Sequence, residues 1–188
     1  MGVLSADLRA EAERIKGRFP EGRERSAILP LLYLVQSVEG RVTAEGLREV
    51  AELLGLKTAE VEAVASFYTM LRLRPTGRHV VSVCTSLSCA LRGAKDVYAK
   101  GRELLGPGCE EATEDGQFTL HEEECLGACD AAPVVQVNFA NYDGVTPQRL
   151  EEILGALRGG QAPAPSRGPF PGDFKEASRI LAGLEAET

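Results

Sequence analysis

The sequence lacks the features that mark a membrane span, a nucleotide site or a thiol–disulfide reductase. No stretch approaches the ~20 consecutive apolar residues that a spanning helix needs. Residues 1–14 alternate acids and bases without the apolar core of a signal peptide, so we expect a cytoplasmic chain. There is no glycine fingerprint for a dinucleotide and no P-loop. A Cys-x-x-Cys motif is also absent, which argues against a thioredoxin-type reductase.

Basic residues and histidines are scarce as well. The chain has 21 Lys and Arg against 28 Asp and Glu, for a net charge of −7. A net negative charge disfavours binding to nucleic-acid phosphates and to anionic membrane surfaces. We therefore expect no nucleic-acid partner and no direct membrane insertion. His79 and His121 are the two histidines, and we interpret both as ordinary strand residues.

Residues 1–75 have the apolar periodicity of helices and are predicted to form a helical N-terminal domain. Ser26, Thr43 and Thr58 each precede or open an apolar stripe and are predicted helix caps. Gly55 is predicted to end the second of these helices, because glycine accepts the left-handed conformation at a helix C-terminus. The Pro75-Thr76-Gly77 stretch interrupts the pattern and marks a boundary.

Residues 76–158 change to a mixed rhythm of strands and helices. Short β-branched or alternating runs predict strands, and longer amphipathic runs predict helices. The resulting order is β-α-β-β-α with one further short strand, which is the outline of a thioredoxin-like α/β domain. The predicted elements are strands at 79–84, 117–123, 133–138 and 141–145, and helices at 90–105 and 146–158.

Residues 159–188 are predicted to be a linker and a short C-terminal helix. Residues 159–172 are rich in Gly, Pro and Ala, which favours a flexible linker. Residues 173–187 have an amphipathic pattern with Phe174 and Ala177 on the apolar side. The fold class is thus α+β or α/β: an N-terminal helical bundle followed by the thioredoxin-like domain and this tail.

Four of the five cysteines form two close pairs, Cys84-x4-Cys89 and Cys125-x3-Cys129. Each pair follows a predicted strand, and in a βα…ββ layout both loops lie at the same end of the sheet. Four thiolates can then meet at one site. Disulfides are disfavoured in a reducing compartment. Structural zinc and a [2Fe–2S] cluster both accept four thiolates, and spacing alone leaves both open.

The cysteine loops are longer than the short knuckles of most structural zinc sites. They also hold small residues such as Ser88 and Gly127, which allow backbone N–H groups to approach the sulfurs. Rieske ligation needs two histidines beside two cysteines, and neither histidine lies in a cysteine loop. Cys109 is isolated in the 106–112 loop and is interpreted as a surface or semi-buried thiol that is not a ligand.

Two segments resemble the motifs of the thioredoxin-like [2Fe–2S] ferredoxin family. Residues 83–94, VCTSLSCALRGA, resemble its first motif, and residues 124–134, ECLGACDAAPV, resemble its second. Residues 64–70 and 74–77 resemble the helical attachment found in part of the family, and residues 114–120 also fit. The resemblance spans about residues 15–158, with order and spacing kept, and is strongest to E-type subunits of NADH–quinone oxidoreductase (respiratory complex I).

This resemblance implies one [2Fe–2S] cluster on Cys84, Cys89, Cys125 and Cys129, which are both the cofactor-binding and the metal residues. It implies an electron-transfer subunit in the peripheral arm of a membrane-attached complex, without a catalytic site of its own. FMN and NADH would be held by a partner subunit, beside other peripheral-arm subunits. The tail from 159 onward lies outside the resemblance.

Two alternatives remain at this stage. Similar subunits occur in NAD-linked hydrogenases and formate dehydrogenases, and the sequence does not separate these assemblies. Residues 43–68 also have the outline of a helix-turn-helix, which would suggest a DNA-binding redox sensor. Glu60 and Glu62 lie at the start of its second helix, where phosphates would approach, and count against that hypothesis.

Overall fold

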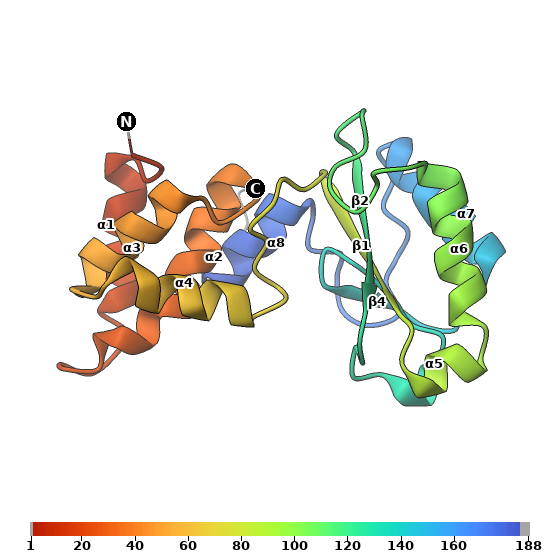
Figure 1. The fold of residues 1–188 in the computed structure, drawn as a ribbon, viewed down its shortest axis with the longest axis horizontal. Coiled ribbons are helices and arrows are strands. Elements are labelled where there is room, and N and C mark those ends of the chain that lie inside the picture. The colour runs from red at the N-terminus through yellow and green to blue at the C-terminus, as the bar shows by residue number, and fades with distance from the viewer. Residues whose placement is uncertain (1, 185–188) are drawn as a thin grey trace. The chain divides into compact units, whose positions relative to one another are not determined.

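The computed structural model describes residues 2–184, which divide into two compact units. The helical unit comprises residues 2–75 and 174–184, and the α/β unit comprises residues 76–173. The chain therefore passes between the units twice, at 75–76 and at 173–174 (Figure 1). The first passage coincides with the predicted break at Pro75.

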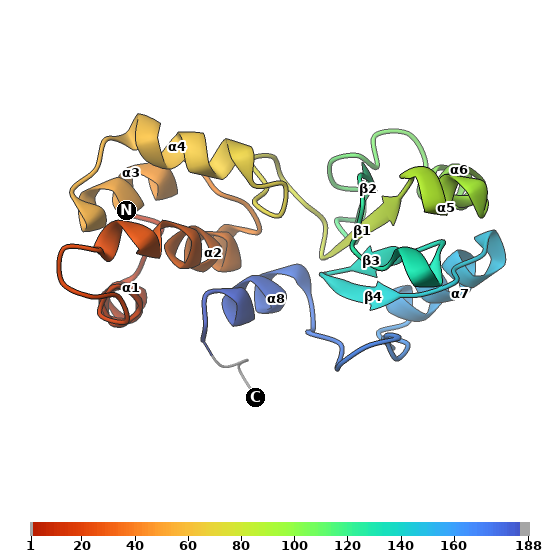
Figure 2. The same ribbon diagram turned by 90° about the horizontal axis from the view of Figure 1, so that it is seen from below.

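The helical unit is built around α2, which is buried along most of its length. Thr43 caps α3 by accepting a hydrogen bond from the Gly46 N–H, and Gly55 ends it in the left-handed conformation, as predicted. Ser26 lies instead within a 3₁₀ turn, and Thr58 is the first residue of its helix rather than the cap. The elements are α1 (Ala6–Lys16), α2 (Ile28–Glu39), α3 (Ala44–Leu54), α4 (Thr58–Phe67) and α8 (Phe174–Leu181) (Figure 2).

Helix α8 follows the α/β unit in sequence but packs on α2. Phe174 is only 1% exposed, and the buried Gln36 amide donates to Ser178 Oγ at 3.1 Å. The structure thus groups this helix with residues 2–75, whereas the sequence suggested a separate tail. The amphipathic pattern revealed the helix but not the core that buries it. Residues 185–187 of the predicted helix lie outside the described residues.

The α/β unit holds a four-stranded sheet in the order β2-β1-β3-β4. Strand β1 pairs parallel with β2, and the β3–β4 hairpin is antiparallel and joined to β1 through β3. Helices α6 and α7 pack together over one face of the sheet (Figures 1 and 2). The elements are β1 (His79–Cys84), α5 (Leu87–Leu91), α6 (Ala94–Leu105), β2 (Phe118–Glu123), β3 (Val135–Val137), β4 (Ala140–Tyr142) and α7 (Pro147–Arg158).

The predicted helix at 90–105 is interrupted near the cysteines. Gly93 adopts φ +90°, a left-handed conformation that glycine accepts at little cost, and it separates α5 from α6. The break gives Cys89 a short helix of its own. Residues 147–158 form α7 as predicted, with Thr146 accepting the cap hydrogen bond from Arg149 N–H and Pro147 at the first position.

Residues 159–173 run along the α/β unit rather than forming the free linker that their composition suggested. The Tyr142 hydroxyl donates to Pro163 O at 2.7 Å, and the Ser166 N–H donates to Asn141 O at 2.8 Å. The buried Asn138 amide donates to Gly172 O at 2.8 Å. The segment therefore supplies polar partners to β4, the last strand in the sheet that residues 2–184 form.

Among the described residues, no helix is long and apolar enough to cross a membrane.

Candidate metal centre

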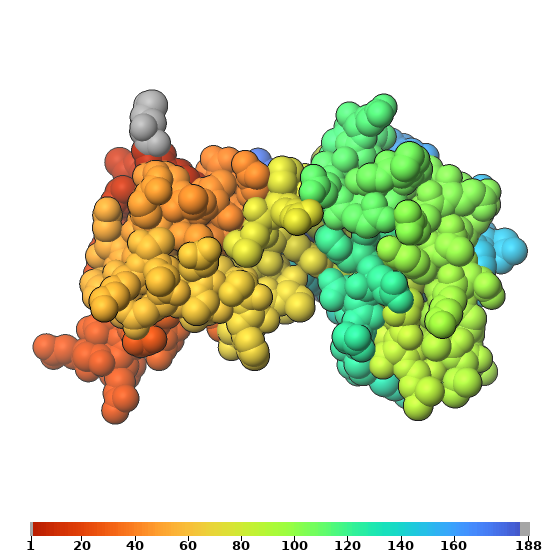
Figure 3. Space-filling view, viewed as in Figure 1, coloured from red at the N-terminus to blue at the C-terminus, as the bar shows by residue number. Residues whose placement is uncertain are grey.

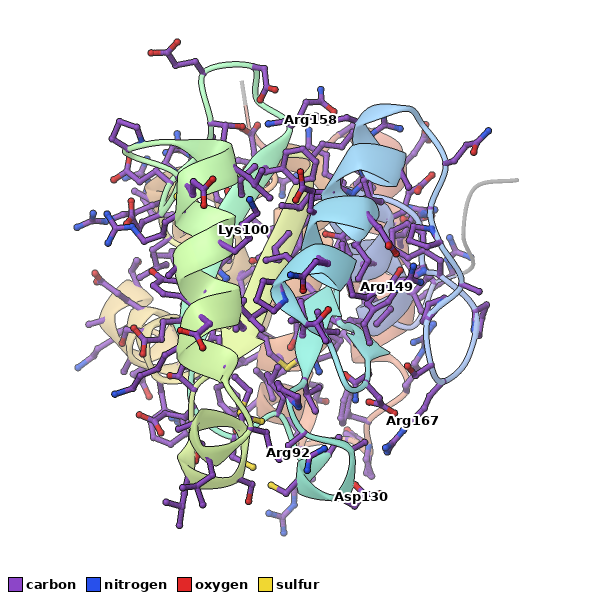
Figure 4. All side chains as sticks on the ribbon, turned by 90° about the vertical axis from the view of Figure 1, so that its right-hand side faces the viewer. Arg92, Lys100, Asp130, Arg149, Arg158 and Arg167 are labelled. Carbon is purple, nitrogen blue, oxygen red and sulfur yellow. The ribbon has the colours of Figure 1, made fainter. Side chains whose placement is uncertain are left out.

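The two cysteine loops lie at one end of the sheet, as the strand order predicts. Strands β1 and β2 are parallel and in register, with Cys84 opposite Glu123, so their carboxyl ends coincide. Cys84 ends β1 and Cys89 lies in the middle of α5. Cys125 follows β2 in a loop, and Cys129 begins the 3₁₀ turn Cys129–Ala131. Figure 4 shows sulfur atoms gathered between α5 and the turn that carries Asp130.

The four thiols interact both within and between the pairs. Cys125 Sγ and Cys129 Sγ are 3.3 Å apart, and Cys84 hydrogen-bonds to Cys89. A thiolate at Cys84 would raise the pKa of Cys129, and a thiolate at Cys129 would raise that of Cys89, so the two pairs lie close to each other. In the part of the chain that the structure describes, no three His, Cys, Asp or Glu side chains are already placed to hold a metal ion.

The two pairs differ sharply in exposure. Cys84 and Cys89 are each only 2% exposed, whereas Cys125 and Cys129 face solvent. Burial, with a smaller contribution from Cys84, raises the pKa of Cys89 to about 11. The Gly127 N–H donates to Cys125 Sγ at 3.4 Å and, with the Cys129 thiol, lowers the pKa of Cys125. The same contact between the two thiols raises the pKa of Cys129.

Small residues in the loops bring hydrogen-bond donors to the sulfurs, as we predicted for Gly127. Two further donors were not identified from the sequence: the Val134 backbone N–H hydrogen-bonds to Cys89, and the Ser88 side chain to Cys129. Donors of this kind stabilise the negative charge of a thiolate. Val134 directly precedes β3. The spacing of the cysteines alone does not reveal that this residue lies beside Cys89.

The remaining candidate residues lie away from this site. Cys109 is fully buried in the core of the α/β unit, so the predicted surface or semi-buried position is wrong. Its backbone carbonyl accepts from the Leu120 N–H, which draws the 106–112 loop inward. His79 and His121 lie in β1 and β2 as ordinary strand residues, as predicted.

The family model of thioredoxin-like [2Fe–2S] ferredoxins matches residues 12–158. The chain belongs to the thioredoxin-like [2Fe–2S] ferredoxin family. Its relatives within this family include the E-type subunit of the NADH–quinone oxidoreductase of Mycobacterium tuberculosis, which is 49% identical over 179 residues, 95% of this chain and 70% of that protein. The NADH–quinone oxidoreductase subunit 2 of Thermus thermophilus is 47% identical over 143 residues, 76% of this chain and 78% of that protein.

A solved structure of NAD⁺-reducing [NiFe]-hydrogenase shares the fold. It superposes with a TM-score of 0.61 at 21% identity, over 72% of this chain and 22% of the hydrogenase chain. At this identity the likeness concerns the fold alone. The arrangement of helices and strands in this thioredoxin-like ferredoxin therefore has a counterpart in a solved structure.

The donor set of the site fits the group for which the family is named. The two loops at one end of the sheet carry four free cysteines, and thiolate is the usual ligand of a [2Fe–2S] cluster. Backbone and hydroxyl donors approach three of these sulfurs. Cys125 and Cys129 are solvent-exposed, so the site is open on one side.

Proposed function

We propose that this chain is the E-type electron-transfer subunit of NADH–quinone oxidoreductase. In this proposal Cys84 and Cys89 hold one iron of a [2Fe–2S] cluster, and Cys125 and Cys129 hold the other. The position of both cysteine loops at one end of the sheet carries the proposal, in a chain that is 47–49% identical to subunits of that enzyme. A bound cluster would supply one-electron transfer with the FMN of an NADH-oxidising partner subunit.

The residues of this chain would position the group and tune its charge. The buried pair and its surrounding small apolar residues exclude water from one side, as Ala94, Ala128 and Val134 pack around Cys84 and Cys89. The N–H groups of Gly127 and Val134 stabilise negative charge on the sulfurs they contact. Glu124, next to Cys125, opposes added negative charge.

The partner subunit, rather than this chain, would bind FMN and NADH and carry out hydride chemistry. We place the chain in the peripheral arm of the membrane-attached complex, together with other peripheral-arm subunits. This placement is supported by the 47–49% identity to subunits of NADH–quinone oxidoreductase.

The test is an anaerobic purification of the full chain, followed by iron, sulfide and zinc analysis and by visible and EPR spectra. We expect two irons and two sulfides per chain and a [2Fe–2S] EPR signal upon reduction. Zinc without iron would contradict the cluster assignment. Copurification then identifies the assembly: an FMN-binding subunit with membrane subunits supports complex I, whereas nickel-site subunits would identify a hydrogenase.

A further inference from the structure

Residues 163–167 lie along strand β4 and the turn that follows it. The family model ends at residue 158, so this segment lies outside the match. The Ser166 N–H donates to Asn141 O at 2.8 Å, and Ser166 Oγ accepts from the Asp143 N–H at 2.8 Å. Both contacts lie within the α/β unit, so they fix the segment to the end of β4.

Arg167 ends this segment in an ion pair with Asp143. Its Nε and Nη2 donate to Asp143 Oδ2 at 3.3 and 3.2 Å. The Asp143 side chain is only 22% exposed, and its Oδ1 is buried without a hydrogen-bond partner in residues 2–184. A largely buried carboxylate needs a cation to compensate for the water that it has lost. Arg167 supplies that compensation, so its removal should cost more than that of an ordinary surface arginine.

The turn that begins at Asp143 is hydrogen-bonded to the turn that carries Cys129. The Gly144 N–H donates to Ala131 O at 2.8 Å. Ala131 is the last residue of the 3₁₀ turn that Cys129 begins. Contacts therefore run without a gap from Arg167, through the residues after β4, to the turn of an exposed cysteine.

Arg167 also reaches this turn directly. Its Nη2 lies 3.8 Å from Asp130 Oδ1, in an ion pair that is open to solvent (Figure 4). Asp130 directly follows Cys129 in the sequence, so the guanidinium places a positive charge close to an exposed thiol of the site. One side chain thus contacts two carboxylates, one in the turn after β4 and one in the cysteine loop.

The loop that carries the exposed cysteines has little packing of its own to hold it. Of residues 122–130, only Ala128 is buried. The loop lies at the surface, beside α5 at the same end of the unit (Figures 1 and 3). A loop with few buried apolar contacts opens at a low cost in free energy. Polar contacts at its end therefore have a large share in keeping it closed.

We propose that Arg167 is a positioning residue for the candidate metal centre, which holds the turn of Cys129 in place through Asp143 and adds a positive charge beside it. This inference rests on the proposed function above and extends it to a segment outside the family match. The hydrogen bonds keep the Cys129 thiol beside the other three cysteines. The charge favours the reduced state of a bound cluster, because reduction adds a negative charge.

The first measurement uses the metal-free full chain and does not depend on a cluster. Hydrogen exchange of the Gly144 amide, followed by NMR at constant pH, reports how often its contact with the Cys129 turn opens. We expect Arg167→Gln to speed this exchange about 2- to 10-fold, through the loss of a half-exposed ion pair. The matched control is Arg102→Gln, which removes another half-exposed arginine of the α/β unit from its ion pair with Glu110 and should leave the exchange unchanged.

The second measurement uses the iron-loaded full chain. Iron release to a chelator should be about 2- to 10-fold faster in Arg167→Gln, and redox-titrated EPR should give a lower midpoint potential. Arg167→Lys keeps the charge but replaces the planar guanidinium fork with a single ammonium group. It should therefore restore most of the potential, while its iron release stays faster than that of the wild type. Arg102→Gln should match the wild type in both measurements.

Three outcomes would overturn the inference and leave the proposed function standing. The first is wild-type exchange at Gly144 together with wild-type iron release in Arg167→Gln. The second is equal acceleration at Gly144 and at the amides of β1, because Arg167 would then stabilise the whole unit rather than position the turn. The third is a midpoint potential that Arg167→Gln leaves unchanged. A wild-type chain without the [2Fe–2S] EPR signal would instead contradict the proposed function, and exchange in the metal-free chain would still test the contacts of Arg167.

Discussion

Cys84 and Cys89 are held by a strand end and a helix and are almost fully buried, whereas Cys125 and Cys129 lie in an exposed loop. The buried pair is fixed by backbone that the sheet and α5 already determine. The exposed pair depends on the conformation of its own loop, in which Gly127 has φ +75°. One side of the site is therefore rigid by packing, and the other is adaptable and open to solvent.

The interpretation of the buried and exposed pairs as two sides of one cluster site is wrong if either pair is dispensable for cluster binding. We expect Cys84→Ser and Cys125→Ser to lose most or all of the bound iron, since a [2Fe–2S] cluster needs thiolates on both irons. Cys109→Ser is the control and should keep full iron content, because Cys109 lies in the core away from the site. Iron analysis and EPR measure the effect. Full iron content in Cys125→Ser would remove the exposed pair from the ligand set.

Thiol alkylation in the metal-free chain tests the difference in environment between the exposed and the buried pair, because the thiolate is the reactive form. The lowered pKa of Cys125 gives it more thiolate at a given pH, and the pKa of about 11 leaves Cys89 almost fully protonated at pH 8. Cys125 should therefore react with iodoacetamide at a lower pH than Cys89 and about 100-fold faster at pH 8. Peptide mass spectrometry over a pH series measures both rates. Equal alkylation rates for Cys125 and Cys89 would contradict the proposed difference between their environments.

Gly127→Ala tests the loop that carries the exposed pair. A side chain at positive φ costs about 1 kcal/mol of stability, although a Cβ at Gly127 would meet no atom within 4 Å. Gly116→Ala is the matched control, with φ +66° and equally open space in a turn away from the cysteines. We expect similar losses of unfolding free energy in denaturant titrations. Only Gly127→Ala should speed iron loss to a chelator.

Glu124→Gln should give the smallest effect. Removing a negative charge beside Cys125 should favour the reduced state and raise the midpoint potential by roughly 20 mV, for a solvent-screened interaction of ~0.5 kcal/mol. Redox-titrated EPR measures the potential. Glu114→Gln, an exposed carboxylate in the turn before β2, should leave the potential unchanged. No change in Glu124→Gln would remove this carboxylate from the electrostatics of the site.

The sequence predicted most elements of the α/β unit because each has a clear local signal. The β-branched run at His79–Cys84, the alternation at Phe118–Glu123 and the cap at Thr146 all have their expected structures. Parallel pairing of β1 and β2 then brings the two cysteine loops together. The location of the candidate site therefore follows from strand order, whereas the identity of its ligands stays a prediction.

Tertiary contacts account for what the sequence did not predict. Composition suggested a free linker at 159–172, but its backbone has hydrogen-bond partners on β4 that lie far away in sequence. The depth of Cys109 depends on a loop folded over the edge of β2. The Val134 donor to Cys89 likewise depends on sheet geometry, so the spacing of the cysteines could not reveal it.

The return of α8 to the helical unit sets an order of events during synthesis. The core around α2 includes Ala182 and the hydrogen bond from Gln36 to Ser178, and both Ser178 and Ala182 leave the ribosome after every residue of the α/β unit. Domains fold as units during translation. All four cysteines of the candidate site are thus available to fold and to meet a metal donor before the helical unit can complete its core.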